Sequence, residues 1–223
     1  MGMRERVRRG AAHASFLFLV LLVGMLPLAA CVQTVRETGS PAYRDLRTPL
    51  TRVAVAPFRM APLLRQRAER GDDPDVSAAL VARHFSEALA QRGIDVVAPN
   101  DMRQALAPEE AEKPLPAAAL AKLAADKFGA DALVVGELTR FTERRGQAAS
   151  AMRPASVGFR VTLYAAPQGQ VLWSGAFDET QRALSENIFN VARYPGGGMR
   201  WLTGEELARW GAQETAAAMP LGR

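Results

Sequence analysis

The segment Gly129-Ala-Asp-Ala-Leu-Val-Val-Gly136 carries the strongest topological signal in this chain. The alanine-rich run before it, residues 115–128, has the composition of a helix, and Gly129 suits the left-handed position at which helices often end. Asp131 then opens an apolar, β-branched run to Leu138, which predicts a buried strand. A helix followed directly by a buried strand is typical of an α/β sheet with crossover connections.

The same order of elements is predicted earlier in the chain. The run Arg52-Val-Ala-Val-Ala-Pro-Phe58 predicts a buried strand that a proline stops. Asp73-Pro74 marks a helix start, and Gly93 marks the end of that helix. Residues 94–98 then predict a second buried strand, and residues 100–106 a short helix. Strands that alternate with helices in this way are expected to lie parallel to one another.

The second half of the chain changes character. Residues 157–165 and 171–177 alternate apolar with polar side chains around a turn at Pro167-Gln-Gly169, which predicts an antiparallel hairpin. Thr203, with Glu206 three residues later, predicts a capping box that starts a final helix. The fold class is therefore an α/β sandwich with helices packed on a mixed sheet of about five strands, in the order β-α-β-α-α-β-β-β-α.

The N-terminus has the layout of a secretory leader. Four arginines and one glutamate stand within the first nine residues, and residues 16–28 carry no charge. The uncharged stretch could instead form a short signal anchor, but Gly24 and Pro27 interrupt its second half. We expect residues 1–30 to form a signal peptide that is cleaved.

The end of this leader resembles the lipobox of bacterial lipoproteins, on the residues Leu28, Ala29, Ala30 and Cys31. The resemblance implies that Cys31 becomes the first residue and carries a covalent lipid, the only cofactor-like group we expect. Two or more acyl chains anchor a protein firmly to a membrane. Val32 stands where lipoproteins retained at the inner membrane usually have Asp, so we expect anchoring at the periplasmic face of the outer membrane.

Composition excludes several other classes of protein. Cys31 is the only cysteine, so neither an intramolecular disulfide nor a cluster of thiolate metal ligands can form. The leader contributes +3 to the net charge of +5, which leaves +2 on the mature chain. The remaining charges alternate in sign, which is typical of solvated helix faces, and we expect no nucleic-acid partner.

Residues 31–51 are predicted to be the lipidated cysteine and a flexible tether, because the segment after Cys31 is polar and lacks apolar periodicity. Such a coil would span about 25 Å. In an alternative, residues 43–46 lie along the domain as a strap. Residues 52–220 are predicted to form a single periplasmic α/β domain, which matches the length expected of one domain.

Three segments in this order resemble a family of periplasmic lipoprotein domains: Val53-Ala-Val-Ala-Pro-Phe58, Gly93-Ile-Asp-Val-Val97 and Gly129 to Gly136. The family includes the curli secretion lipoprotein, the lipoprotein activators of penicillin-binding proteins and the amino-terminal domain of the Tol system's propeller protein. These motifs are structural, so the resemblance implies a fold but no active-site residue. The long alternating segments of the curli channel members are missing here, so the resemblance does not imply a channel.

The sequence predicts no catalytic residue and no metal site. His84, the only histidine after the leader, lies within a predicted helix, and neither a zinc-ligand spacing nor a serine nucleophile elbow accompanies it. Residues 195–198 are rich in glycine, but the Lys-Ser/Thr pair of a phosphate loop does not follow them. The glutamate pairs at 109–110 and 205–206 are expected in a polar loop and in the first turn of a helix, respectively.

Residues 185–201 concentrate aromatic and arginine side chains in an irregular stretch. They either cover one face of the sheet or form a docking surface, since both residue types are enriched at interface hot spots. The candidate partner-binding residues are Phe189, Arg193, Tyr194, Arg200 and Trp201.

These observations predict a lipid-anchored periplasmic interaction or scaffold module in cell-envelope assembly or transport, without catalysis. Its expected partners are the membrane and another envelope protein. One alternative is a subunit of a homo-oligomeric secretion or assembly complex. A second alternative is an envelope hydrolase whose unfamiliar site would have to use His84.

Overall fold

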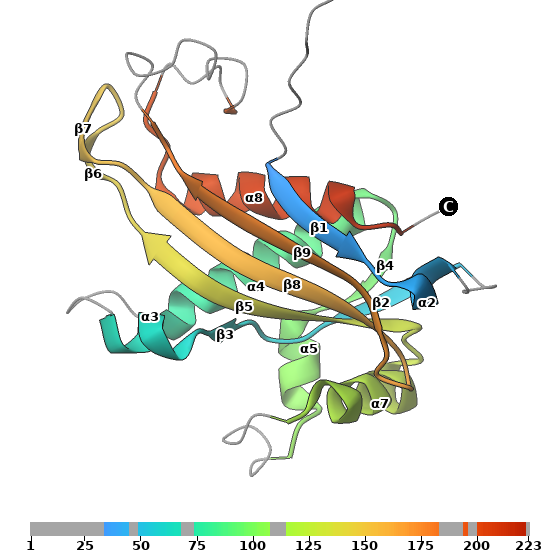
Figure 1. The fold of residues 1–223 in the computed structure, drawn as a ribbon. Helices are drawn as coiled ribbons and strands as arrows, with labels where there is room; N and C mark the ends of the chain where they lie inside the picture. The colour runs from blue at the N-terminus through green and yellow to red at the C-terminus, as the bar shows by residue number, and fades with distance from the viewer. Residues whose placement is uncertain are drawn as a thin grey trace, which may run out of the picture. The chain divides into compact units, whose positions relative to one another are not determined.

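A seven-stranded mixed sheet runs through the structure, and helices pack against it (Figure 1). The structure is a computed structural model that describes residues 34–44, 49–67, 74–107, 115–182, 194–195 and 200–221. The predicted leader, the lipobox and Cys31 lie outside these residues. The fold class is the predicted one, a mixed α/β architecture, with more strands than the sequence indicated.

The strands lie in the order β1-β9-β8-β5-β2-β4, and β3 also pairs with β5. Strands β2, β4 and β5 are mutually parallel, as predicted, whereas β5, β8, β9 and β1 form antiparallel neighbours. The bounds of the seven strands are β1 Val35–Gly39, β2 Arg52–Val55, β3 Arg59–Met60, β4 Asp95–Val97, β5 Ala132–Thr142, β8 Ser156–Ala165 and β9 Val171–Thr180.

The predicted helices are present, with bounds that differ by up to two residues where a cap was predicted. Gly93 and Gly129 have φ angles of 79° and 63°, so both occupy the left-handed conformation that glycine adopts without strain. The predicted capping box at Thr203 is formed. The described helices are α2 Pro41–Arg44, α3 Pro62–Arg67, α4 Pro74–Gln91, α5 Pro99–Gln104, α7 Ala117–Phe128 and α8 Gly204–Ala218.

Two hydrophobic cores lie on opposite faces of the sheet. Val53 and Val55 belong to the larger core, together with the apolar faces of α4 and α8. Ala54, between them, points to the other face and packs with residues of α5 and α7. Both faces of β2 are therefore buried, which explains why its sequence is a continuous apolar run rather than an alternating one.

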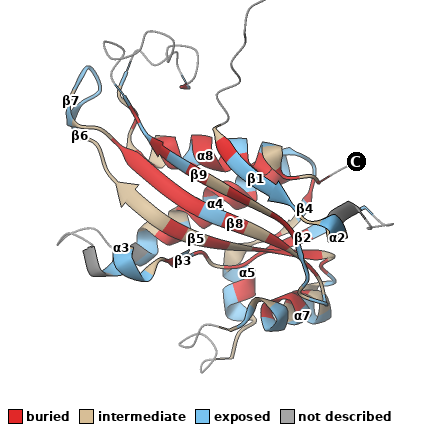
Figure 2. Cartoon of the chain, viewed as in Figure 1, coloured by how far each residue is buried: buried red, intermediate tan, exposed pale blue. Residues whose placement is uncertain are grey.

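The second face is left open over the antiparallel half of the sheet. The residues of β9 and β8 that point away from the larger core include Asp178, Arg160, Thr162 and Ser174, all partly or fully exposed. They pair with one another or with neighbours: Ser174 with Thr162 across 3.4 Å, and Arg160 with Glu137 across 3.6 Å. Figure 2 shows this mixture of burial along β8 and β9. Polar alternation predicted this half-solvated face.

The predicted tether is wrong for residues 35–39. This segment is strand β1, which pairs with β9 from Val35 opposite Phe177 to Gly39 opposite Trp173, and the compact unit begins at Thr34. Four of its five residues are exposed, so it has no apolar periodicity to reveal it. The segment is a strand because its backbone pairs with the edge of β9, and its own sequence does not reveal that pairing. The strap predicted at residues 43–46 falls largely outside the described side chains.

The first predicted strand ends as the proline in its sequence indicates, and one hairpin was missed. Strand β2 ends at Val55, and pairing to β5 resumes at β3, because Pro57 cannot donate a ladder hydrogen bond. A short hairpin, β6 Arg145–Gln147 and β7 Ser150–Arg153, was not predicted. It forms a separate two-stranded sheet beyond the end of β5.

Gly136 allows a close approach inside the larger core. A Cβ atom built at this position would lie 2.3 Å from the ring of Phe58, which in turn contacts the ring of Phe85 on α4 with 5.9 Å between ring centroids. The absent side chain thus lets Phe58 lie directly on β5 and brings the helix against the sheet.

We expect Gly136→Ala to lower the free energy of unfolding by about 1 to 3 kcal/mol, because the added methyl overlaps Phe58 and forces the core to shift. Urea unfolding of the mature protein measures this loss. The matched control is Gly39→Ala in β1, where a Cβ meets nothing within 4 Å and the change should stay within about 0.5 kcal/mol. Equal effects of both variants would contradict this account of Gly136.

Candidate functional site

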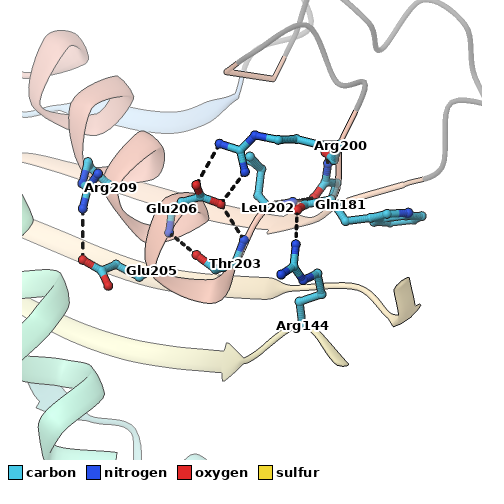
Figure 3. Close-up of polar contacts among 9 residues, drawn as sticks. Arg144, Gln181, Arg200, Leu202, Thr203, Glu205, Glu206 and Arg209 are labelled. Atoms are coloured by element: carbon cyan, nitrogen blue, oxygen red, sulfur yellow. Dashed lines mark hydrogen bonds and ion pairs between the residues drawn. The ribbon is translucent and has the colours of Figure 1, made fainter. Parts of the chain in front are cut away.

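A network of polar contacts surrounds the start of α8, at the end of the sheet where β5 and β9 finish (Figure 3). Arg200 donates two hydrogen bonds to Glu206, Nη1 to Oε2 and Nη2 to Oε1, each of 2.8 Å. The Glu206 carboxylate also accepts from the Thr203 backbone at 2.9 Å, and Thr203 Oγ1 accepts from the Glu206 backbone at 3.1 Å. One carboxylate therefore caps the helix and holds the arginine of the preceding loop.

Side chains from other elements hydrogen-bond to the backbone of residues 200–202, which lead into α8. Buried Gln181 accepts a 2.6 Å hydrogen bond from the backbone N–H of Leu202 and donates one of 2.8 Å to the carbonyl of Arg200. Arg144 donates to the carbonyl of Trp201 at 2.5 Å. Side chains from β5's exit and β9's end therefore fix residues 200–202 in one position, which favours a structural role for this stretch.

The ion pair changes the acidity of Glu206. The hydrogen bonds from Arg200 lower the pKa of Glu206 to about 2, against the opposing effect of burial, and the Thr203 backbone adds to the lowering. The same pair raises the pKa of Arg200. Both groups therefore stay charged across the physiological range, and neither is poised to transfer a proton near neutral pH.

The structure describes three of the five predicted partner-binding residues, Tyr194, Arg200 and Trp201. Tyr194 is buried and donates a 2.6 Å hydrogen bond to Glu179. Its ring packs against the ring of Trp210 with 5.4 Å between the ring centroids, so it covers the core. Arg200 is exposed but engaged with Glu206. Trp201 is half-buried, and its backbone donates to Ala148 at 2.8 Å. Phe189 and Arg193 lie outside the described residues.

Tyr194 is buried in this structure, and the docking hypothesis for residues 185–201 stays a prediction. The sequence showed an aromatic residue in a loop-rich stretch, and only the packing of α8 against β9 shows that this ring fills the space beside Trp210 and Phe177. The alternative interpretation, in which the stretch covers the sheet, holds for this residue. Its buried hydroxyl needs a polar partner, which buried Glu179 supplies.

His84, which the sequence placed within a helix, lies buried between α4 and α8. Nδ1 is 3.1 Å from Glu87 on the same helix, and Nε2 is 3.4 Å from Glu205 on α8. The imidazole is 2% exposed, so both nitrogens face carboxylates rather than an open site. His84 therefore lies at the contact between the two helices. The sequence could not predict this contact, because Glu205 is over a hundred residues away from His84 in the chain.

An open groove of about 470 Å³ lies between α4 and α5. Apolar side chains, among them Val76 and Leu80, form part of its lining, and Arg83, Glu87 and Arg103 add charge. The sequence did not indicate this groove because its lining comes from two helices and from Ala98 at the start of the second, and none of these segments has a motif. In the described ranges, no group of three or more acidic, histidine or cysteine side chains could hold a metal ion.

Comparison with known proteins gives fold likenesses only. The sequence matches no family model and no curated protein sequence. Among solved structures, the PelC dodecamer from Paraburkholderia phytofirmans is 14% identical, with 85% of this chain and 99% of that chain covered and a TM-score of 0.46. Lipoprotein GNA1162 from Neisseria meningitidis is 15% identical, with 64% and 94% covered and a TM-score of 0.38.

The LpoB C-terminal domain from Escherichia coli is 17% identical, with 63% of this chain and 94% of that chain covered and a TM-score of 0.38. None of the three is a curli secretion lipoprotein or a Tol protein, and those parts of the resemblance stay predictions. At these identities and TM-scores the likenesses do not extend to activity or partners.

We expect Glu206→Gln to lower the free energy of unfolding at pH 7 by about 1 kcal/mol, because the neutral amide keeps the cap but loses the ion pair with Arg200. A carboxylate whose pKa is lowered by folding stabilises the protein above its unfolded pKa, and this contribution disappears as the pH falls toward about 2. The difference from wild type should therefore shrink below about pH 4.5.

Urea unfolding at pH 7 and at pH 3 measures this convergence. The control is Glu137→Gln, which removes only the exposed 3.6 Å pair with Arg160 and should change stability by less than about 0.5 kcal/mol at either pH. A Glu206→Gln deficit that stays constant between the two pH values would contradict the role given to the Arg200 pair.

Proposed function

We propose that this chain is a lipid-anchored, non-catalytic interaction module at the periplasmic face of the outer membrane, serving cell-envelope assembly or transport. The observation that carries the proposal is the position of Cys31, at the end of the apolar leader and three residues before the compact unit begins at Thr34. A cysteine in that place can be acylated while leaving the whole sheet domain folded outside the bilayer.

The anchoring proposal is supported by the described part of the chain itself. No helix there combines the length and the apolar composition that a bilayer span requires. The domain has two cores of its own on the two faces of one sheet. A lipid on Cys31 would then supply the attachment to the membrane, and we expect the partner to be another protein of the envelope.

The non-catalytic proposal is supported by what the ionisable side chains do. Glu206 caps α8, Glu179 binds the Tyr194 hydroxyl, and His84 lies buried between carboxylates of two helices. Each of these groups stabilises a contact between elements. A hydrolase that used His84 as a base would have to open the α4–α8 interface to reach a substrate, which weighs against that alternative.

A subunit of a homo-oligomer is the second candidate, and the observation that favours it is β1. This strand ends the sheet, and residues 36–39 are exposed. An exposed edge strand presents backbone donors and acceptors to which another chain can pair. Light scattering of the detergent-solubilised lipoprotein separates the candidates, since a monomer mass excludes the oligomer.

We expect Cys31→Ala to lose the acyl mass, because the variant offers no thiol for the acyl anchor. The wild-type protein should be recovered in membranes at the mass of an acylated chain starting at Cys31, whereas the variant should carry no lipid. Intact mass spectrometry of both proteins is the measurement. An unmodified wild-type mass would sink the proposal.

We expect Val32→Asp to keep the acyl mass but to move the protein from outer to inner membranes, since Asp after the cysteine marks inner-membrane retention in the lipoproteins that the leader resembles. Density-gradient separation of the two membranes measures the change, and Val32→Asn serves as the uncharged control. If wild type and Val32→Asp fractionate together, the proposed location at the outer membrane is wrong although the anchor is intact.

A further inference from the structure

The start of β1 lies at the same end of the sheet as the β6–β7 hairpin (Figure 1). Paired residues of four neighbouring strands form one row across the sheet: Val35, Phe177, Phe159 and Leu138. From this row β5 runs on to Thr142, just before the hairpin, whereas β1 runs in the opposite direction. The described chain therefore enters the sheet at Thr34 from the hairpin side.

The distance from Cys31 to this end of the sheet is limited by covalent geometry. Thr34 is the third residue after Cys31, and a fully extended chain covers at most about 3.6 Å per residue, so the Cα atoms of these two residues can be no more than about 11 Å apart. Acyl chains on Cys31 would hold that residue at the bilayer interface. The hairpin end of the sheet would then be held beside the bilayer, because β1 replaces the long tether.

The hairpin has a composition suited to such a surface. Residues 144–153 include three arginines and no acidic residue. Residues 145–150 are exposed, and Met152 is 85% exposed, more than any other exposed large hydrophobic side chain in the described chain. The hairpin contributes to neither hydrophobic core. Arginines attract anionic headgroups, and an exposed apolar side chain beside them can enter the boundary between headgroups and acyl chains.

We infer that the β6–β7 hairpin rests on an anionic phospholipid surface when the protein is anchored through Cys31, with the exposed Arg145 at the headgroups and Met152 at the acyl boundary. The inference deepens the proposed function and depends on its lipid anchor. It assigns an orientation: the β6–β7 end faces the membrane, and the opposite end of the sheet, where β9 begins at Val171, faces away.

The test uses the acylated protein reconstituted in vesicles of phosphatidylethanolamine and phosphatidylglycerol. Cys31 is the only native cysteine and is blocked by acylation, so Met152→Cys provides a unique thiol for a fluorescent label. Nitroxides on the lipid headgroups quench a label only at short range. We expect several-fold stronger quenching at position 152 than in the matched control Val171→Cys, an exposed apolar position at the other end of β9.

Charge is tested by Arg145→Glu combined with Ser150→Glu, two exposed positions outside both cores. In the Met152→Cys background we expect these changes to weaken quenching, and neutral phosphatidylcholine vesicles to weaken it as well. Far-ultraviolet circular dichroism checks that the variant is folded. Arg160→Glu, on the open face of the sheet and away from the hairpin, is the charge control and should leave quenching at position 152 unchanged.

Vesicle flotation of the same samples separates the two proposals. Protein that does not float overturns the lipid anchor and, with it, the orientation. Protein that floats but shows equal quenching at positions 152 and 171 overturns the orientation alone. Strong quenching at position 152 that is the same in neutral and anionic vesicles overturns the assignment of an anionic surface.

Discussion

Asp131 is the residue on which the arrangement of the central strands depends. Its Oδ2 atom accepts three hydrogen bonds of 2.9 Å, from the backbone N–H of Thr51, from the Thr51 hydroxyl and from the backbone N–H of Arg52. Burial raises the pKa of Asp131, but these donors together hold it below its ordinary value. The Asp131 carboxylate therefore links the residue before β5 to the first residues of β2. This contact sets the register of the parallel pair where the two strands begin.

The parallel pair then determines how the two faces of the sheet are used. Both faces of β2 and of the first half of β5 are covered, one by α4 and α8 and the other by α5 and α7. The antiparallel half of the sheet keeps a polar face that is partly or fully exposed at Asp178, Arg160, Thr162 and Ser174. The contacts of α8, through Glu206, Glu205 and the ring of Trp210, close the larger core. The carboxylates of Glu205 and Glu206 thus hold structural elements together.

Strand β1 connects the fold to the proposed biology. Its pairing with β9 moves the beginning of the domain from residue 52 to residue 34, the third residue after Cys31 in the sequence. If Cys31 carries the proposed lipid, the domain would follow its anchor without a long tether. The chemistry of the β6–β7 hairpin matters for that reason.

The sequence by itself determined the elements whose signals are local. Apolar β-branched runs specified β2, β4 and β5, alternation specified β8 and β9, and Gly93, Gly129 and Thr203 specified helix ends, since caps and periodicity act within a few residues. Tertiary structure alone decided the rest. The polar segment of β1 is a strand only because β9 offers an open edge, and Tyr194 and His84 are buried only because α8 packs over them. The pairing of β1 and the burial of Tyr194 and His84 depend on residues that are distant in the sequence, so no local sequence pattern predicts them.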